Sequence, residues 1–207
     1  MSDPSDSFAA LIVERKTGNE PLHQDGNPLG QTLLDFWRWS ASDLVSNATR
    51  GVLAEYIVAT ALGVAGGARV EWDPFDLLSQ EGAKIEVKSA AYLQSWRQRK
   101  ASAITFTIRP TQAPDVETSV ADGRLERRAD IYVFCVLHHA HKGTLDPLDV
   151  NQWTFYVLSA AVLNERFPQQ KTISLAPLLR TEPHVARYQD LAACVTSVWR
   201  TLSGDQP

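Results

Sequence analysis

The sequence lacks the features that direct a chain into a membrane, into an oxidising compartment or onto nucleic acid as a general coat. No apolar run approaches the roughly 20 residues that span a bilayer, and the N-terminal segment MSDPSDSFAA is acidic and polar. The two cysteines, Cys135 and Cys194, lie in apolar stretches where a small buried thiol is the usual explanation. The net charge of −4 argues against coating by clustered Lys and Arg. We therefore expect a cytoplasmic protein, without secretion or membrane insertion.

The 207 residues, 44% of them hydrophobic and 21% charged, are enough for one domain with a substantial core. Residues 1–30 are rich in Ser, Asp, Gly, Pro and Asn, which predicts a partly ordered N-terminal arm. We predict that residues 31–207 form a single domain that ends in a strand and helix extension.

Hydrophobic periodicity predicts the order of helices and strands. Helical patterns occupy residues 31–40, 51–68, 159–167 and 184–202. Strand patterns occupy a hairpin within 70–91, then 104–108, 129–138 and 153–158. The stretch 129–138 is nearly continuously apolar, as in a strand covered on both faces, and should be central. Residues 110–128 contain two prolines and a glycine, which predicts a loop or a short, weak helix. The fold class is therefore α/β, with a mixed central β-sheet flanked by helices.

Within the predicted hairpin of residues 70–91, an acidic residue faces a triplet that holds an acid and a lysine. Asp76 lies ten positions before Glu86, and Glu81-Gly82 is a good turn pair because glycine tolerates the positive φ of a short hairpin. Strand side chains alternate between faces, so Glu86 and Lys88 share one face about 6.6 Å apart. Folding at the turn therefore sets two carboxylates beside one ammonium group.

A further carboxylate, Glu55, is the one charged residue in the helical stretch 51–68. One face of this helix, at helical spacing, holds Ala48, Val52, Glu55, Ala59 and Leu62. A carboxylate on a buried helix face needs a partner. Two explanations stay open: a salt bridge to Arg50 or another neighbour, and a place in the acidic site of the hairpin.

Glu55, Asp76 and the triplet Glu86-Val87-Lys88 together resemble the PD-(D/E)xK nuclease superfamily, which has the restriction-endonuclease-like fold. The similarity covers about residues 43–137. It implies an αβββαβ core: a helix with a Glu, a hairpin with the Asp on its first strand and the triplet on its second, and then a strand, a helix and a strand. Phe75 separates Pro74 from Asp76, so the opening Pro of the motif is displaced by one position.

The resemblance implies a role for each of these residues. Asp76 and Glu86 are implied as metal-ligating carboxylates, Lys88 as the catalytic lysine and Glu55 as an auxiliary acid. The backbone carbonyl of Val87 can add a ligand. Carboxylate oxygens are hard ligands, so this site selects Mg²⁺ or Mn²⁺ over softer metals.

Three sets of nearby residues have weaker claims. Gln94 and Ser89 can touch substrate or support the hairpin, and bracing is favoured for Gln94. The histidines of residues 138–141 suit a solvated loop better than a zinc site, because alternate positions cannot all converge on one ion. Arginine and lysine residues form two local clusters that can border the acidic site as a basic groove: Arg97, Arg99 and Lys100, and Arg124, Arg127 and Arg128. For any one of these residues, solvated surface charge is the favoured explanation.

The sequence therefore predicts a metal-dependent endonuclease that hydrolyses DNA, with a restriction or phage-defence enzyme as one form of it. The alternative is a catalytically inactive accessory domain on the same fold that binds nucleic acid or protein. DNA is the expected partner. Dimerisation, or partner subunits of a defence or repair system, is expected by analogy with enzymes that cut both strands of a palindromic duplex.

Overall fold

The computed structural model describes residues 11–71, 73–114 and 121–204, and these form two compact units. The N-terminal unit contains residues up to Ser42 together with Gly66–Glu71. The main unit contains Asp43–Ala65 and the chain from position 72 onward. Within the described ranges, no helix is long and apolar enough to cross a membrane.

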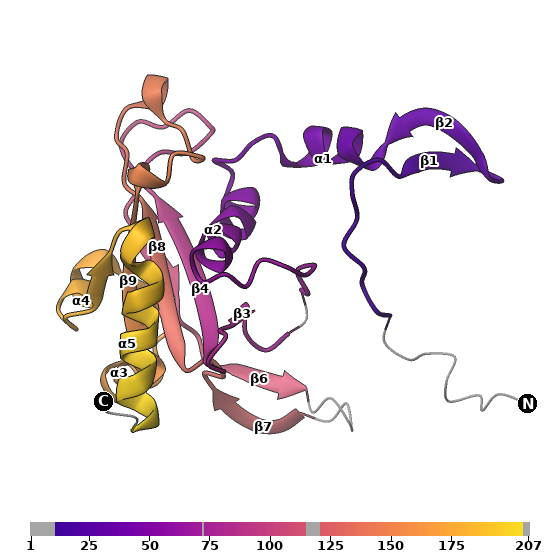
Figure 1. The fold of residues 1–207 in the computed structure, drawn as a ribbon. Helices are drawn as coiled ribbons and strands as arrows, with labels where there is room; N and C mark the ends of the chain where they lie inside the picture. The colour runs from indigo at the N-terminus through magenta and orange to yellow at the C-terminus, as the bar shows by residue number, and fades with distance from the viewer. Residues whose placement is uncertain (1–10, 72, 115–120, 205–207) are drawn as a thin grey trace, which may run out of the picture. The chain divides into compact units, whose positions relative to one another are not determined.

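The N-terminal unit consists of a β-hairpin followed by one helix (Figure 1). Strands β1 (Pro21–Gln24) and β2 (Asn27–Thr32) are antiparallel, and helix α1 (Leu33–Ala41) follows at once. The turn residues Asp25 and Gly26 both have positive φ, which suits the right-handed twist of a two-residue hairpin. The predicted helix at 31–40 is therefore confirmed, whereas the predicted arm contains a hairpin. Residues 1–10 of that arm lie outside the described ranges.

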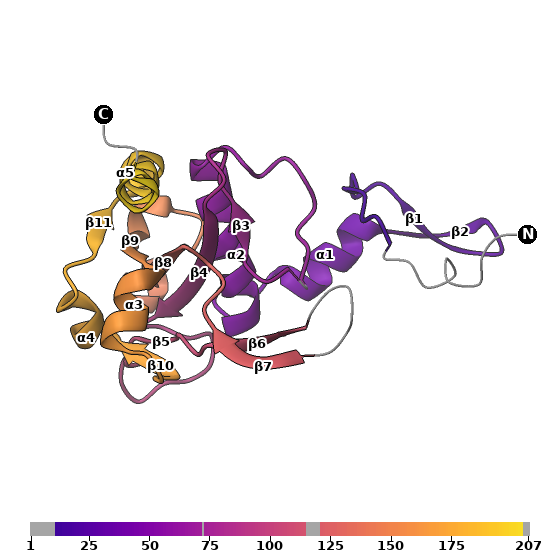
Figure 2. The same cartoon turned by 90° about the horizontal axis from the view of Figure 1, so that it is seen from below.

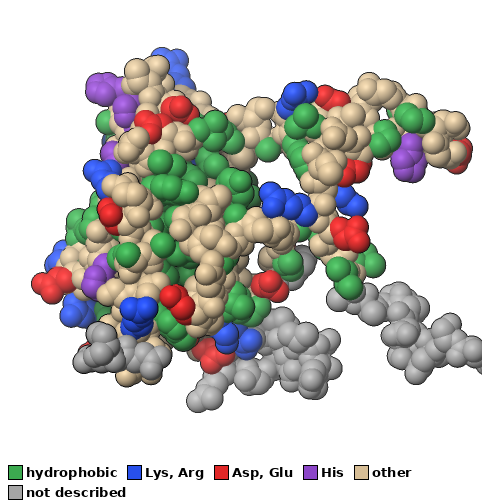
Figure 3. Space-filling model, viewed as in Figure 1, with side chains coloured by type: hydrophobic (Ala, Val, Ile, Leu, Met, Phe, Trp, Pro, Cys, Tyr) green, Lys and Arg blue, Asp and Glu red, His purple; other side chains and the backbone are tan. Residues whose placement is uncertain are grey.

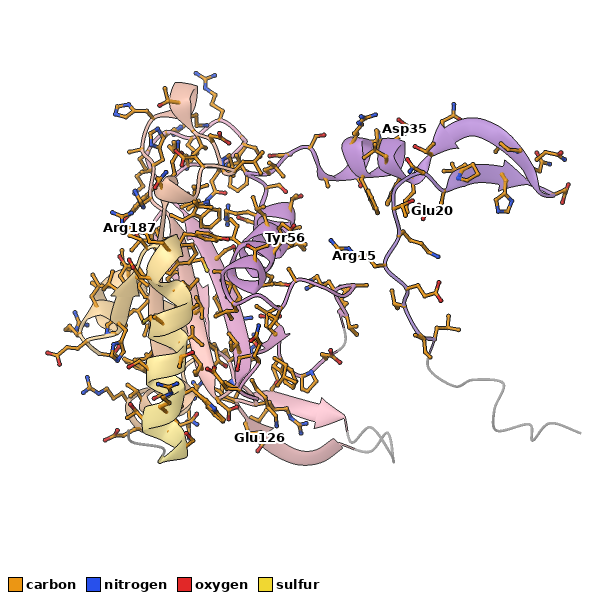
Figure 4. All side chains as sticks on the ribbon, viewed as in Figure 1. Arg15, Glu20, Asp35, Tyr56, Glu126 and Arg187 are labelled. Carbon is orange, nitrogen blue, oxygen red and sulfur yellow. The ribbon has the colours of Figure 1, made fainter. Side chains whose placement is uncertain are left out.

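Two carboxylates organise the N-terminal unit (Figure 4). Asp35 accepts hydrogen bonds from the Thr32 amide at 2.9 Å and from the Thr32 hydroxyl at 3.0 Å, which caps α1. Glu20 accepts bonds from the backbone amides of Thr17 at 2.9 Å and Gly18 at 2.8 Å. These amide donors stabilise the ionised carboxylate and lower the pKa of Glu20 to about 2.

The main unit is built on a five-stranded mixed sheet with the strand order β11, β9, β8, β4, β3. Its strands are β3 (Leu77–Leu78), β4 (Lys84–Ala91), β8 (Ile131–Leu137), β9 (Trp153–Ser159) and β11 (His184–Ala186). Strands β4 and β8 are parallel, and the other neighbouring pairs are antiparallel. Every residue of β8 is buried, so the prediction of a central strand at 129–138 is confirmed.

Helices cover both faces of this sheet, which confirms the predicted α/β class. Figure 2 shows α2 and α3 on opposite sides of strands β4 and β8. The helices of the main unit are α2 (Asn47–Ala61), α3 (Ala160–Arg166), α4 (Leu175–Leu179) and α5 (Leu191–Ser203). Short 3-10 turns occur at Lys142–Thr144, Val150–Gln152 and Tyr188–Asp190.

The alternation of side chains along β4 and β8 divides the core into two layers. One layer lies between the sheet and helices α2 and α5, and its members from the two strands include Ile85, Val87 and Val133. The other layer contains α3 and the antiparallel pair β5 (Thr105–Thr107) and β10 (Thr172–Ser174). Since each face of the sheet has its own apolar layer, the face to which a polar side chain of β4 points determines which of the two layers surrounds it.

Three segments differ from the sequence-based predictions. The stretch predicted as a loop or weak helix holds the hairpin of β6 (Thr111–Pro114) and β7 (Ala121–Glu126), and its residues 115–120 lie outside the described ranges. The predicted strand at 104–108 exists as β5, but it pairs with β10 and not with the main sheet. The predicted terminal helix at 184–202 begins only at Leu191, because its first residues pair with β9 as β11.

Candidate active site

The β3–β4 hairpin forms from a short turn that the local sequence encodes. The Gly82 amide donates to the Ser79 carbonyl at 3.1 Å, and Gly82 has a φ of +89° that favours glycine. The Ser79 hydroxyl accepts a bond from the Ala83 amide at 3.0 Å. The resulting register pairs Leu77 with Ile85, so one further step sets Asp76 opposite Glu86. The ten-residue spacing therefore produces the juxtaposition that the sequence predicts.

Asp76 is held against β4 by main-chain groups. Its own amide donates to the Ile85 carbonyl at 3.0 Å, and its Oδ2 accepts a bond from the Val87 amide at 2.7 Å. The half-buried carboxylate thus lies at the middle residue of the acid-lysine triplet. Because both bonds use backbone of the neighbouring strand, the position of the carboxylate follows from the hairpin register.

Glu86 and Lys88 form a direct ion pair on one face of β4, between Nζ of Lys88 and Oε1 of Glu86. Their side chains are 20% and 28% exposed, so the pair is accessible but shielded from bulk water on most sides. In the parallel register they lie beside Tyr132 and Phe134 of β8, which belong to the layer that contains α3. Val87 between them faces the opposite layer. The predicted alternation of an acid and a base on one face with an apolar residue on the other is present.

The pKa values of two β8 side chains record the negative charge of this region. Burial raises the pKa of Tyr132, and the charges of Glu86 and Asp76 raise it further, while Arg127 opposes them. Burial also raises the pKa of Cys135, with additional contributions from Asp76 and Glu55. The charge of Asp76 therefore raises the pKa of a side chain in each apolar layer. It acts together with Glu86 on Tyr132 and together with Glu55 on Cys135.

Glu55 lies at the edge of the buried face of α2. That face holds Arg50, Ala54, Ile57, Val58 and Ala59, about one residue away from the face predicted from the sequence, and Val52 is 45% exposed. The guanidinium of Arg50 directs hydrogen bonds to the Val45 carbonyl and to the side chains of Asn47 and Gln94.

The donor set of the site consists of two neighbouring carboxylates. Across residues 11–71, 73–114 and 121–204, no group of three or more His, Cys, Asp or Glu side chains is close enough to hold a metal ion. Asp76 lies opposite Glu86 when the β3–β4 register is continued, and its carboxylate binds the amide of Val87, which lies between Glu86 and Lys88. The metal-ligating and catalytic roles of these residues, and that of Glu55, stay predictions.

The structure assigns different surroundings to the two residues predicted to touch substrate or to support the hairpin. Gln94 is 8% exposed: its Oε1 accepts from Arg50 Nη1 at 3.3 Å, and its Nε2 donates to the Ala91 carbonyl at 3.2 Å and to the Ser102 hydroxyl at 3.4 Å. These bonds brace the loop after β4. Ser89 is half-buried and pairs in register with Cys135, on the face opposite Glu86.

The burial of Arg50 is a feature that was not predicted from the sequence. Arg50 is 4% exposed, its burial lowers the pKa of its guanidinium, and its Nε has no hydrogen-bond partner. Helical spacing could have predicted this burial. Arg50 precedes Ala54, Ile57 and Val58 by four, seven and eight positions, so all four residues lie on one face of the helix. The buried guanidinium of Arg50 connects α2 to the loop after β4 through the hydrogen bond to Gln94.

The main unit is therefore an α/β domain whose mixed sheet is flanked by helices, with two carboxylates and a lysine grouped on one hairpin. The model of the bacteriophage T4 endonuclease IV family matches residues 32–177, which is well over half of the chain. The chain belongs to this family, and membership supports a DNA-cleaving hydrolase. The matched range includes Glu55, Asp76, Glu86 and Lys88. No curated protein matches the chain.

Proposed function

We propose that this chain is a Mg²⁺- or Mn²⁺-dependent endonuclease that hydrolyses phosphodiester bonds of DNA through a PD-(D/E)xK site. The observation that carries the proposal is the hairpin, in which the Asp76 carboxylate accepts the Val87 amide next to the Glu86–Lys88 ion pair. The family match supports the nucleolytic activity independently of that geometry.

The donor chemistry fits a hard divalent ion. Mg²⁺ is commonly held by one or two carboxylates and completes its shell with waters and substrate phosphate, so a cage of three carboxylates is not required. Asp76 and Glu86 are the proposed ligands, with the Val87 carbonyl as a third, and Glu55 is proposed as an auxiliary acid. When bound, the ion would supply positive charge that polarises the phosphoryl group and makes water a better nucleophile.

Lys88 is the residue that we propose acts on the reacting phosphate. Its ammonium group has three donors and cannot accept, so it stabilises negative charge that accumulates on the phosphoryl oxygens. The ion pair with Glu86 restricts the Lys88 side chain to the face that carries both acids. The attacking water forms a bond from its oxygen to phosphorus while the bond from phosphorus to the 3′ oxygen breaks. One proton passes to that oxygen, and the products implied by the superfamily are a 5′-phosphate and a 3′-hydroxyl.

DNA is the proposed partner, and the family membership favours it over other phosphodiesters. A restriction or phage-defence role, and a homodimer or partner subunits that serve it, are part of this proposal by analogy alone.

Cleavage of supercoiled plasmid tests the proposal. The native protein should nick or linearise the plasmid with Mg²⁺ or Mn²⁺ and should be inactive with EDTA. Lys88→Ala should lower the rate about a hundredfold or more, because one group that stabilises transition-state charge is removed. Glu86→Ala should abolish cleavage.

The matched control is Lys171→Ala, an exposed lysine that lies just before β10. It should cleave at the native rate. Native rates in both Lys88→Ala and Glu86→Ala would remove the assignment. A native protein that binds DNA and never cleaves it would favour the inactive accessory domain instead.

A further inference from the structure

The loop after β4, residues 92–103, is shaped by polar side chains rather than by regular secondary structure. Gln98 is the centre of this network: its Oε1 accepts from the Gln94 amide at 2.7 Å, and its Nε2 donates to the Tyr92 carbonyl at 3.1 Å and to the Ser102 hydroxyl at 3.0 Å. Gln94 in turn connects the loop to Arg50 of α2. A loop with this many internal bonds presents its outward side chains in a defined arrangement.

The large exposed side chains of this loop are one aromatic residue and three cations. Trp96 is 53% exposed, and Arg97, Arg99 and Lys100 are exposed as well. Residues 92–103 contain no Asp or Glu. In the described part of the chain, none of these three cations forms a salt bridge with a carboxylate. Their charge is therefore available for an external anion.

The loop after β8 adds to the same cationic region. Lys142 is exposed and its Nζ donates to the Trp96 carbonyl at 2.7 Å, which joins the two loops. Figure 3 shows side chains of Lys or Arg, of His and of Asp or Glu at the end of the sheet where Figure 1 draws these loops. The two aspartates of the second loop are engaged locally: Asp146 accepts from the Leu148 amide and Asp149 from the Asn151 amide. We call Trp96, Arg97, Arg99, Lys100 and Lys142 the strand-end surface.

In the second basic cluster predicted from the sequence, the two arginines whose side chains the structure describes are engaged within the protein. Arg127 is 8% exposed, and its guanidinium donates to the Ile108 carbonyl, the Asn164 side chain and the Phe167 carbonyl. Arg128 is half-buried and pairs with Glu126 at 3.4 Å. These two arginines are thus engaged within the main unit, whereas Arg97, Arg99 and Lys100 are exposed.

We propose that the strand-end surface binds the phosphate backbone of the DNA substrate at a distance from the bond that is cut. The proposal rests on the proposed function and names the surface that the substrate occupies. A protein with a net charge of −4 needs a local cationic surface to hold a polyanion, and four cations without carboxylate partners provide it. Trp96 supplies an apolar face for a sugar or base beside those phosphates.

The spacing along β4 agrees with this arrangement. Lys88 and Ala91, the last residue of β4, are three residue steps apart, which is about 10 Å at the usual rise per residue. The strand-end surface therefore begins roughly 10 Å beyond the proposed catalytic lysine.

Salt dependence of DNA binding tests the surface, because each lost phosphate contact changes the slope of log Kobs against log salt concentration by about 0.9. Fluorescence anisotropy with a labelled DNA duplex in EDTA measures binding without cleavage. The triple variant Arg97→Ala, Arg99→Ala, Lys100→Ala should bind more weakly, with a slope shallower by about 2 to 3. Trp96→Ala should weaken binding with an unchanged slope, since no charge is removed.

The charge-matched control is the triple variant Lys171→Ala, Arg180→Ala, Arg200→Ala. These three exposed cations lie just before β10, just after α4 and within α5. It should keep the native slope and affinity. If the triple loop variant also keeps both while the native protein cuts plasmid, the strand-end surface is wrong and the nuclease assignment stands. If the native protein neither binds nor cuts DNA, both proposals fall.

Discussion

The carboxylate of Asp76 has two separable roles, one in the fold and one in the proposed chemistry. As a hydrogen-bond acceptor it satisfies the amide of Val87, which lies beyond the part of β4 that pairs with β3. As a negative charge it is one of the two proposed ligands. An amide oxygen can replace the first role and only poorly the second, so a pair of substitutions separates them.

Asp76→Ala should lower the free energy of unfolding by about 1 to 2 kcal/mol, because a half-buried amide loses its acceptor, and Asp76→Asn should lower it by less. Both variants should lose plasmid cleavage. Urea denaturation gives the stability, and Asp73→Ala, which alters an exposed aspartate of the same segment, should stay within about 0.5 kcal/mol of the native protein. An Asn variant as unstable as the Ala variant would contradict the structural role assigned to the Oδ2 bond.

At the scale of elements, the features that could be predicted are those set by neighbours along the chain. The register of β3 on β4 follows from a turn between Ser79 and Ala83, and the facing of Glu86 and Lys88 follows from strand alternation. The central position of β8 follows from its unbroken apolar sequence. These local rules define the candidate site, which is why the sequence alone indicates its residues.

The features that were missed depend on partners far along the chain. The β6–β7 hairpin has polar and charged residues and a proline in β6, so its sequence shows none of the alternation that marks a half-buried strand. The strand character of His184–Ala186 depends on an open edge of β9, and the same residues continue a helical pattern in the sequence. The bond between Arg50 and Gln94 joins residues 44 positions apart.

The buried polar connection between α2 and the loop after β4 gives the prediction at this scale. Gln94→Ala should lower the free energy of unfolding by about 2 to 3 kcal/mol, since the buried guanidinium of Arg50 loses an acceptor, and the Ala91 carbonyl and the Ser102 hydroxyl lose a donor. Hydrogen exchange should show faster exchange of loop amides within residues 92–103. Affinity for DNA should fall although every cation of the strand-end surface is retained.

Gln80→Ala is the matched control for Gln94→Ala, because Gln80 is exposed and makes one weak bond at 3.5 Å to the Gly63 carbonyl. Its effect should be within about 0.5 kcal/mol. Equal stability of the two glutamine variants would show that the loop does not depend on the connection to Arg50.

At the scale of the whole molecule, both apolar layers are contained in the main unit. Neither core cluster includes a residue of the range 11–42, and α1 has no buried residue. The proposed site residues and the strand-end surface also lie in the main unit. Hydrophobic burial is the dominant favourable contribution to folding, so the stability of the main unit should come from its own residues.

A chain that begins at Asp43 should therefore fold cooperatively, and its thermal midpoint should lie within a few degrees of the native value. For a domain of this size, about 1 kcal/mol corresponds to a shift of roughly 2 to 4 °C, so a small difference is measurable. Circular dichroism melts of the two chains provide the comparison, and plasmid cleavage by the shortened chain reports on the site. A non-cooperative melt would show that residues before Asp43 are needed to complete the main unit. A cooperative melt without cleavage would assign those residues a part in substrate binding, which the charges of the strand-end surface alone would then not explain.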